Sequence, residues 1–368
     1  MPTSSRHSRR PARVVGSLVA TAALLAGCSS GDADDGASTE ASGNDAVHLT
    51  LQWVVQAQFA GFYAGLEQGY YADEGIDLTI QPGGSDVNNL QLLVSGDTDI
   101  AVQSYGNLAA AVDSGADLVG IGVLHERPGA TLIYFTDQGD LSDPASWEGL
   151  TVGNWNGFSA PFSAAAAKNG LDVDTDLTIA NQGFDMSGFL SGEYDLAEAM
   201  TYNEYAQAIA GADGREISTV DYAELGTAVL EDTLVTTPAW LEDNPDLAER
   251  FLRATAKGWL YCRDNPEECV SIVLENGTAL PENYQTWQMN EINKLMWPSD
   301  SGVLGVSEDL VEQSNTILED YDIVSQPVAD DLLDLTARDA AVADLTDEEL
   351  YGDDYTSMDL DPEELFAE

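Results

Sequence analysis

Short apolar segments alternate with helical segments along this chain from residue 47 to about residue 236, and this alternation constrains the fold more than any other feature. Because each strand of such a chain pairs in a sheet and each helix covers a face of it, the rhythm predicts an α/β fold. The chain beyond Asn244-Pro245-Asp246, which combines a helix cap with a first-turn acid, is expected to be largely helical. The predicted strands are 47–55, 76–80, 98–103, 118–124, 131–135, 177–180, 196–200 and 230–236, and the stretch 147–153 is predicted to be a turn that leads into a further strand. The longer predicted helices are 88–95, 107–115, 158–169, 203–210 and 281–297.

The first 28 residues have the pattern of a bacterial lipoprotein signal. Four arginines precede the apolar run Val14–Ala26, which is too short for a spanning helix, and Leu25-Ala26-Gly27-Cys28 resembles a lipobox. In such signals the cysteine is acylated and becomes the new N-terminus, so Cys28 is the predicted lipidation site. The alternative is a cleaved signal with a chance cysteine. Residues 29–46 are rich in Gly, Ser and Asp and are predicted to form a flexible tether, which makes the protein extracytoplasmic and membrane-anchored.

The net charge is strongly negative. The whole chain carries 13 basic and 65 acidic side chains, and removal of the signal leaves nine basic side chains against 65 acidic ones, a net charge of −56. Such a surface repels itself at low salt and is screened at high salt, and nucleic acid is a poor partner for it. We interpret this charge as adaptation to a saline environment, with ordinary acidic variation as the alternative. The stretch 346–368 holds ten acids and no base and is expected to be a solvated acidic tail.

Two cysteines remain after Cys28. Cys262 lies at the end of one predicted helix, and Cys269 lies in the first turns of the next, which begins at Asn265-Pro266. Outside the cell a disulfide across this corner is expected, with two buried free thiols as the alternative. A metal site is not expected, because two cysteines without a nearby histidine lack ligands.

The stretch Trp53–Gly75 is the strongest functional signal. It combines a strand end, a polar turn and an aromatic helix that closes at a glycine. A strand-to-helix turn leaves backbone N–H groups without partners, so it is a natural place to hold a ligand. The residues that crowd this turn can stack on a flat ring or hydrogen-bond to its edge: they are Gln56, Gln58, Phe59, Phe62 and Tyr63.

This stretch resembles the opening of the NMT1/THI5-like family of solute-binding proteins. The resemblance continues through Gly96–Ala101, Gln182–Met186, Ala199–Tyr205 and Gln288–Asn293, and it covers roughly residues 47 to 300. Several ordered blocks at matching spacing make it specific. The resemblance implies a type II periplasmic-binding-protein fold, in which two α/β lobes close on a ligand by hinge motion. The expected boundaries are 47–138 plus 234–345 for lobe 1 and 139–233 for lobe 2.

The resemblance further implies a monomeric binding lipoprotein that delivers a small molecule to an ABC permease and its ATPase, with no cofactor. Family members bind thiamine-precursor pyrimidines, and relatives serve riboflavin and other small organics. A flat nitrogen heterocycle would stack on aromatic walls while amides and carboxylates bind its edge. The predicted walls are Trp53, Phe59, Tyr63, Tyr105, Trp155, Phe158 and Tyr202; the predicted edge groups are Gln56, Gln58, Gln103, Ser104, Asn156, Asn203 and Glu204.

Some of these residues have structural alternatives. Trp53 fits a core strand position as well as a ligand wall, and Asn203 fits a helix cap. Other cargoes also stay open, namely riboflavin or a sulfonate, as does an extracellular sensor lipoprotein that serves no transporter. An anion would call for basic lining, for which Arg127 and Arg215 are the few candidates.

An enzymatic role is not expected. The eukaryotic members of this family are pyrimidine synthases that carry a histidine as substrate donor and a cysteine-rich motif. Aligned through Trp53 and Gly61, that histidine falls on Phe59, and the cysteine cluster has no counterpart.

Overall fold

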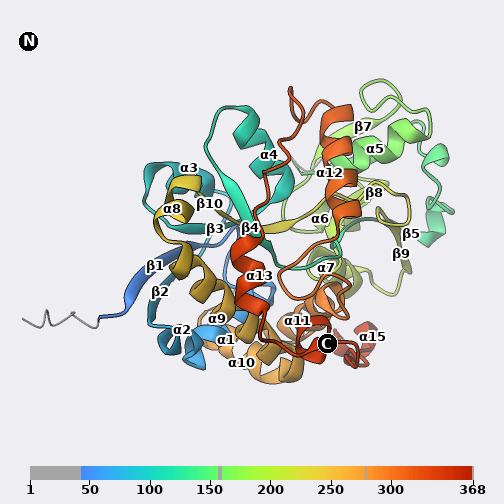
Figure 1. The fold of residues 1–368 in the computed structure, drawn as a ribbon. Helices are drawn as coiled ribbons and strands as arrows, with labels where there is room; N and C mark the ends of the chain where they lie inside the picture. Colours follow the sequence, from blue (N-terminus) through green and yellow to red (C-terminus); the bar gives the residue numbers. More distant parts are fainter. Residues whose placement is uncertain (1–42, 156–159, 278–279, 367–368) are drawn as a thin grey trace, which may run out of the picture. The chain divides into compact units, whose positions relative to one another are not determined.

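The computed structural model describes residues 43–155, 160–277 and 280–366 of the chain. From residue 43 onward these form one compact unit that contains two five-stranded sheets, each at the centre of a lobe (Figure 1). The predicted signal peptide, Cys28 and most of the tether lie outside the described residues, as do Asn156 and Phe158. Within the described part, no helix is both long enough and apolar enough to cross a bilayer.

The first sheet has the strand order β2-β1-β3-β10-β4, and β10 is antiparallel to both of its neighbours. The strands β1, β2 and β3 are parallel, as expected for strands joined by helical crossovers. The strands of this sheet are β1 (Asp45–Thr50), β2 (Ile76–Gln81), β3 (Ile100–Ser104), β4 (Val119–Val123) and β10 (Asp232–Thr236).

The second sheet repeats the same pattern, with the order β7-β6-β8-β5-β9 and β5 as the antiparallel strand. Its strands are β5 (Ala130–Phe135), β6 (Thr151–Asn154), β7 (Thr178–Asn181), β8 (Leu196–Met200) and β9 (Ile217–Asp221). Each antiparallel strand is the first one after the chain enters from the other lobe. The two α/β lobes and their sheet orders confirm the predicted fold class.

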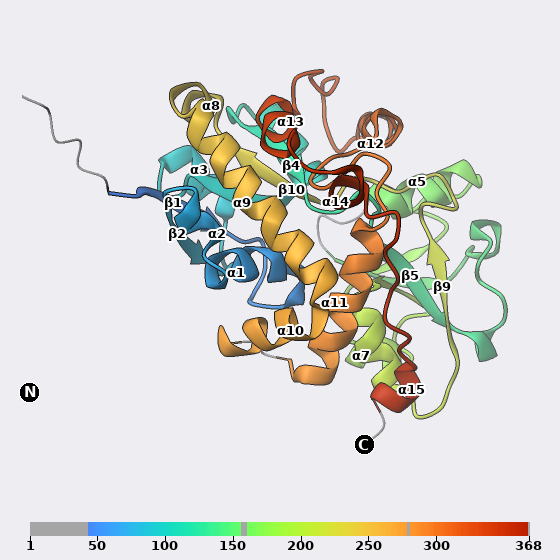
Figure 2. The same ribbon diagram turned by 60° about the horizontal axis from the view of Figure 1, so that its bottom comes forward.

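The helices of lobe 1 come from both ends of the chain. Helix α1 packs against α9 and α10, and α13 packs against α9, as Figure 2 shows in blue, gold and red. The early helices are η1 (Ala57–Phe59), α1 (Ala60–Glu67), α2 (Tyr70–Asp73), α3 (Asn89–Ser95) and α4 (Tyr105–Asp113). The late helices are α8 (Pro238–Asp243), α9 (Pro245–Asp264), α10 (Pro266–Glu275), α11 (Glu282–Met296), α12 (Glu308–Asp320) and α13 (Thr336–Val342).

Lobe 2 carries shorter helices around its sheet. Two of them, α5 and α7, follow the strands β6 and β8, so their N-terminal ends lie at the carboxyl ends of those strands. The helices of this lobe are η2 (Thr136–Gln138), η3 (Pro144–Ser146), α5 (Ala160–Lys168), α6 (Ser187–Leu190) and α7 (Glu204–Gly211).

The lobe boundary and one strand differ from the prediction. Strand β5 was expected in lobe 1, yet it pairs with β8 and β9 of the second sheet, so the first crossing between the lobes precedes residue 130 rather than residue 139. The apolar run of β5 has the composition of any buried strand, and only its partners assign it to a lobe. Strand β9 was not predicted, because Ile217–Asp221 is mostly polar.

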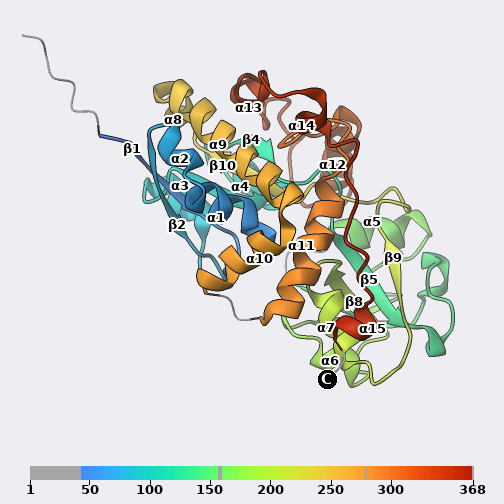
Figure 3. The same ribbon diagram turned by 90° about the horizontal axis from the view of Figure 1, so that it is seen from below.

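The acidic tail was predicted to be solvated, and most of its described acidic side chains are exposed, but the segment also has regular structure that the sequence did not indicate. It forms α14 (Asp347–Tyr351) and α15 (Pro362–Leu365), and α15 contacts α7 of lobe 2 beside α11 (Figure 3). The Phe366 ring lies 4.7 Å from that of Tyr284 on α11. The acidic composition of this segment predicted exposure, but a few of its apolar residues, such as Leu350 and Tyr355, pack against the hydrophobic core.

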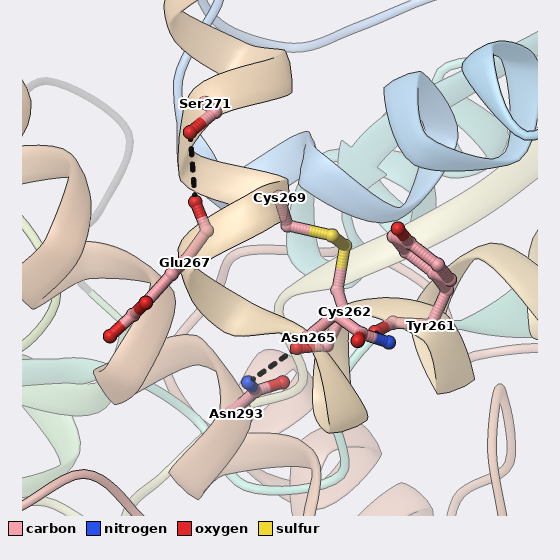
Figure 4. The surroundings of a disulfide bond; sticks show 7 residues. All are labelled: Tyr261, Cys262, Asn265, Glu267, Cys269, Ser271 and Asn293. Carbon is pink, nitrogen blue, oxygen red and sulfur yellow. Dashed lines mark hydrogen bonds between the residues drawn. A yellow bond between two sulfur atoms is a disulfide. The ribbon is translucent and has the colours of Figure 1, made fainter.

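The predicted disulfide is present. Cys262 near the end of α9 bonds to Cys269 in α10, and both cysteines are completely buried (Figure 4). Pro266 occupies the start of α10 as expected, but the Asn265 side chain does not cap this helix. Its Nδ2 instead donates to the Tyr261 carbonyl at the end of α9.

We predict that the Cys262→Ala/Cys269→Ala double variant unfolds at lower guanidinium concentration than the wild type. A disulfide that closes so short a loop lowers the entropy of the unfolded chain and thereby stabilises the folded state by about 2 kcal/mol. The double variant loses this stabilisation and also loses the packing of two buried sulfur atoms. Equilibrium unfolding without reductant measures the difference. A reductant present during unfolding should lower the midpoint of the wild type and leave the double variant unchanged. Equal midpoints for the two proteins without reductant would contradict a stabilising role.

Candidate ligand-binding site

A cavity of about 350 Å³ lies between the two lobes and is the candidate site. Lobe 1 contributes the loop after β1, the loop before α3 and the end of β3, and lobe 2 contributes the segments after β6, β7 and β8. The predicted site residues that line it are Trp53, Gln56, Gln58, Gln103, Ser104, Trp155, Tyr202, Asn203 and Glu204. The lining residues that the sequence did not single out are Gln52, Gly84, Ser85, Val87, Asn107, Phe184, Met200, Glu231 and Asp232.

Three predicted wall residues do not reach the cavity. Phe59, Tyr63 and Tyr105 are at most 5 % exposed and belong to the hydrophobic core. Phe59 is the last residue of η1, and its side chain belongs to the core, whereas the side chains of Gln56 and Gln58 line the cavity. Tyr105 begins α4, and its hydroxyl donates to Asn315 Oδ1 on α12, 2.7 Å away. The sequence identified the correct turn but not which side of it is buried.

Two of the backbone N–H groups of the opening turn are bonded within the protein and not available to a ligand, contrary to expectation. The Ala57 N–H donates to Gln285 Oε1 at 2.7 Å, and the Gln58 N–H donates to Gln288 Oε1 at 3.1 Å. Both acceptors are side chains of α11. Helix α11 therefore fixes the turn, and the turn presents its glutamine side chains instead.

The glutamine side chains of the turn are hydrogen-bonded to the buried carboxylate of Asp232, directly or through one another. Gln56 Nε2 donates to Gln58 Oε1 at 2.6 Å, and Gln58 Nε2 donates to Asp232 Oδ2 at 2.7 Å. Gln52 Nε2 donates to the other oxygen, Oδ1, of Asp232. Asp232 is the first residue of β10 and is 1 % exposed, so its carboxylate lies at the base of the cavity with an amide on each oxygen.

A histidine lies behind this carboxylate. His125 Nε2 is 3.7 Å from Asp232 Oδ2, and Nδ1 donates to the Arg127 carbonyl at 2.9 Å. Burial by itself lowers the pKa of His125, but the neighbouring carboxylates of Asp232 and Glu231 outweigh it and leave the pKa raised. The imidazole therefore supports the negative charge of Asp232 from the side away from the cavity.

Glu231 joins the two crossings between the lobes. Its carboxylate accepts the Gly129 N–H at 2.9 Å and the Ala130 N–H at 2.8 Å, and both donors belong to the other crossing segment. The chain runs from lobe 1 to lobe 2 through residues 124–129 and returns just before β10, so Glu231 ties one connection to the other. Because it also lines the cavity, the hinge and the site share this side chain.

Glu204 is the lobe 2 carboxylate of the cavity. It is 4 % exposed, and its oxygens accept from Asn203 Nδ2 at 3.0 Å and from the Met200 N–H at 3.1 Å. Burial raises its pKa to about 7, partly offset by the hydrogen bond from the Met200 amide. Asn203 does not cap α7 with its side chain, which binds Glu204 instead.

Aromatic rings from both lobes meet at the mouth of the cavity. Strand β1 ends at Thr50, before the predicted end at residue 55, so Trp53 lies in the loop after the strand and not in a core strand. Its ring centroid is 4.5 Å from that of Phe184, and the Trp155 centroid is 6.3 Å from Phe184 on lobe 2. Trp155 Nε1 donates to the Gly183 carbonyl, which fixes the indole against the loop that carries Phe184. These three rings are a stacking surface for a flat ligand.

A larger hollow, about 1120 Å³, lies on lobe 1 between α9, α13 and the edge of the first sheet. Its lining combines aspartates and glutamates with a larger number of aliphatic residues, it has no aromatic lining residue, and all of its residues come from one lobe. The interlobe cavity is smaller but combines rings, amides and buried carboxylates from both lobes, which is the composition of a small-molecule site. Among the residues that the structure describes, no cluster of metal ligands is present.

The family model described as NMT1/THI5 like matches residues 56–269, more than half of the chain. The chain belongs to this NMT1/THI5-like family. The match begins at Gln56 in the opening turn and includes the cavity residues of lobe 2.

Relatives of this family member include binding proteins and synthases. A formylaminopyrimidine-binding protein of Halalkalibacterium halodurans is 25 % identical over 71 % of this chain and 78 % of its own length. A riboflavin-binding protein, RibY of Chloroflexus aurantiacus, is 25 % identical over 62 % of this chain and 66 % of its own. A 4-amino-5-hydroxymethyl-2-methylpyrimidine phosphate synthase of Uromyces fabae is 23 % identical over 58 % of this chain and 66 % of its own.

The fold is similar to that of solved periplasmic binding proteins. The periplasmic aliphatic sulphonate binding protein SsuA of Escherichia coli superposes with a TM-score of 0.62. The two chains are 16 % identical, and the match covers 80 % of this chain and 91 % of SsuA. At this identity the similarity shows the fold and does not identify the ligand.

Glu198 lies behind the cavity in β8 and gives a test of the electrostatics of lobe 2. It is completely buried; Oε1 accepts from Asn154 Nδ2 and the Tyr222 hydroxyl, and Oε2 has no hydrogen-bond partner. Burial raises its pKa from 4.5 to about 8. Between about pH 4.5 and pH 8 the folded protein keeps a proton on Glu198 that the unfolded chain releases. The contribution of Glu198 to the free energy of unfolding is therefore fully present below about pH 4.5 and is lost as the pH rises to about 8.

We therefore predict that Glu198→Gln raises the melting temperature above pH 8 relative to the wild type and leaves it nearly unchanged at pH 4. The amide keeps the acceptor for Asn154 and Tyr222 and removes the cost of an ionised buried oxygen. Thermal melts from pH 4 to pH 9 measure this. Glu193→Gln, at an exposed position of the same lobe, is the matched control and should follow the wild-type curve. Parallel curves for wild type and Glu198→Gln would contradict the shifted pKa.

Proposed function

We propose that this protein is the substrate-binding lipoprotein of an ABC importer and that it captures a small nitrogen heterocycle such as a thiamine-precursor pyrimidine. The observation that carries the proposal is the combination of Glu204 with the aromatic rings of Trp53, Trp155 and Phe184 in a cavity between two hinged lobes. A flat ring stacks on the aromatics, and an exocyclic amine donates to the Glu204 carboxylate. The formylaminopyrimidine-binding relative supports this choice of cargo.

The size of the cavity favours a single ring. At about 350 Å³ it lies at the small end of ligand pockets, which span about 300–1,000 Å³. A monocyclic pyrimidine with short substituents suits this volume better than the three fused rings and sugar-like chain of riboflavin. Riboflavin stays the second candidate on the strength of the riboflavin-binding relative.

An anionic cargo such as a sulfonate is disfavoured by where the arginines lie. Arg127 donates to the backbone carbonyls of Lys294 and Pro298, and Arg215 pairs with Asp137 at 2.7 Å. Neither lines the cavity. The carboxylates that do line it would repel a sulfonate.

A synthase role is disfavoured by position 59. The resemblance aligns the substrate-donating histidine of the fungal enzymes with Phe59, whose side chain is completely buried in the core. That position cannot present a reactive group to the cavity. We therefore favour capture of a ligand over its conversion.

In this proposal Cys28 carries the lipid anchor and holds the protein at the outer side of the cell membrane, next to its permease and ATPase. The prediction is that Cys28→Ser moves the protein from the membrane fraction to the soluble fraction of the expressing cells. Ser30→Ala, which alters a neighbouring residue outside the predicted lipobox, is the control and should leave the membrane fraction unchanged. A membrane-bound Cys28→Ser protein would contradict acylation at this residue.

The ligand is tested by thermal shift and titration calorimetry with the full-length protein in high salt. We expect aminopyrimidines to raise the melting temperature, since ligand at 100 times Kd stabilises by about 2.7 kcal/mol. Riboflavin, thiamine and taurine are the comparison ligands. A shift with taurine and none with any heterocycle would overturn the cargo; no shift with any of them, together with no adjacent permease and ATPase genes, would favour the sensor alternative.

Two variants test the site itself. We expect Glu204→Gln to weaken aminopyrimidine binding about 10- to 100-fold, the usual cost of a lost charged hydrogen bond, and Trp155→Ala to weaken it by removing a stacking wall. Glu224→Gln, an exposed acid of the same lobe, is the control and should bind as the wild type does. Melting temperatures of the ligand-free proteins check folding. Wild-type affinity in both site variants would refute the proposed site.

A further inference from the structure

Three carboxylates form the base of the interlobe cavity, and each of their six oxygens accepts one N–H donor. The donors are Asn203 and the Met200 amide for Glu204, the Gly129 and Ala130 amides for Glu231, and Gln52 and Gln58 for Asp232. All three side chains are at most 5 % exposed. The donors are neutral, so they orient the carboxylates without cancelling their charge. We call these three residues the carboxylate floor.

Cations of the protein do not balance this charge. No lysine or arginine is among the described residues that line the cavity. Among the residues that the structure describes, the basic side chain with an ion-pair contact to the floor is His125: it approaches Asp232 at 3.7 Å, and its other nitrogen donates to the Arg127 carbonyl. One imidazole thus faces three carboxylates, and Glu198 of β8 adds a further buried acid on the lobe 2 side.

Burying charges without a partner is costly, so an unbalanced floor points to a partner that arrives with the ligand. The aromatic rings of Trp53, Phe184 and Trp155 lie close to one another at the same mouth, and the faces of aromatic rings attract cations. We infer that the cavity takes its ligand as a cation, that is, as a nitrogen heterocycle that is protonated on binding or is permanently charged. This inference rests on the proposed function and specifies the charge of the cargo.

The pKa shifts of Glu204 and Glu231 agree with this geometry. Burial raises the pKa of Glu204 to about 7 and also raises the pKa of Glu231, so the empty site resists full ionisation near neutral pH. The groups that face the floor are His125 from the end of β4, Tyr202 from the loop after β8 and Glu198 from β8. A bound cation favours the ionised carboxylates, and by linkage the carboxylates favour the protonated ligand.

Proton uptake on binding tests the inference. The probe is 4-amino-2-methylpyrimidine, which is neutral in solution at about pH 8.5, where Glu204 is already ionised. Titration calorimetry of the full-length protein in two buffers of different ionisation enthalpy counts the protons exchanged. We expect uptake of about one proton per ligand bound. Binding with no uptake would overturn the cationic cargo and leave the proposed function standing, whereas no binding of any aminopyrimidine would overturn both.

Matched probes and variants sharpen the result. The benzene analogue 3-methylaniline keeps the ring and the amine but has no ring nitrogen to protonate, and we expect it to bind at least tenfold more weakly. Asp232→Asn should weaken the pyrimidine at least tenfold and lower the proton uptake, whereas the exposed Asp117→Asn should change neither. Melting curves verify that Asp232→Asn is folded. Equal affinity for the pyrimidine and the aniline would overturn the inference even if Asp232→Asn proved unstable.

Discussion

Helix α1 crosses helix α9 at a contact that only glycine allows, and the position of the candidate site depends on it. A Cβ on Gly258 would lie 2.1 Å from the Gly61 carbonyl oxygen, and one on Gly61 would lie 2.3 Å from the Trp259 ring. Interiors pack too densely to absorb such an overlap, so any larger residue forces the helices apart. Because the turn 56–59 runs directly into α1, this crossing sets how far the turn glutamines reach into the cavity.

Helix α11 completes the positioning from the other side. Its glutamines Gln285 and Gln288 hold the backbone of the turn, while Trp287 on the same helix donates from Nε1 to the Thr201 carbonyl of lobe 2. One helix therefore contacts the lobe 1 turn and the loop that precedes Glu204. The turn is thus held by contacts within lobe 1, whereas the Trp287 contact joins the two lobes.

The sequence predicted the alternation of elements well because strand and helix signals are local. Asn88 and Gly96 bound α3 as expected, with the Asn88 side chain accepting from Gln91 and Gly96 in the left-handed conformation. Lobe membership is not local. Strand β5 lies between a segment of lobe 1 and a segment of lobe 2 in the sequence. The residues Ala130–Phe135 are all buried and carry no signal for which sheet they join. The packed tail was missed for a related reason, since its few apolar residues have partners about 70 residues or more away in sequence.

The candidate site was predicted in the same uneven way. Residues that gather within one loop, such as Tyr202-Asn203-Glu204, were recognised because their chemistry is concentrated in sequence. Glu231 and Asp232 were overlooked because they read as the start of an apolar strand, Asp232-Thr233-Leu234-Val235. Their role arises from topology: β10 enters the first sheet between β3 and β4, which places its first residues at the hinge, beneath a turn that is 174 residues away in sequence. The imidazole of His125 faces the charge at this position from lobe 1, and the ligand that meets the charge must be understood from both lobes together.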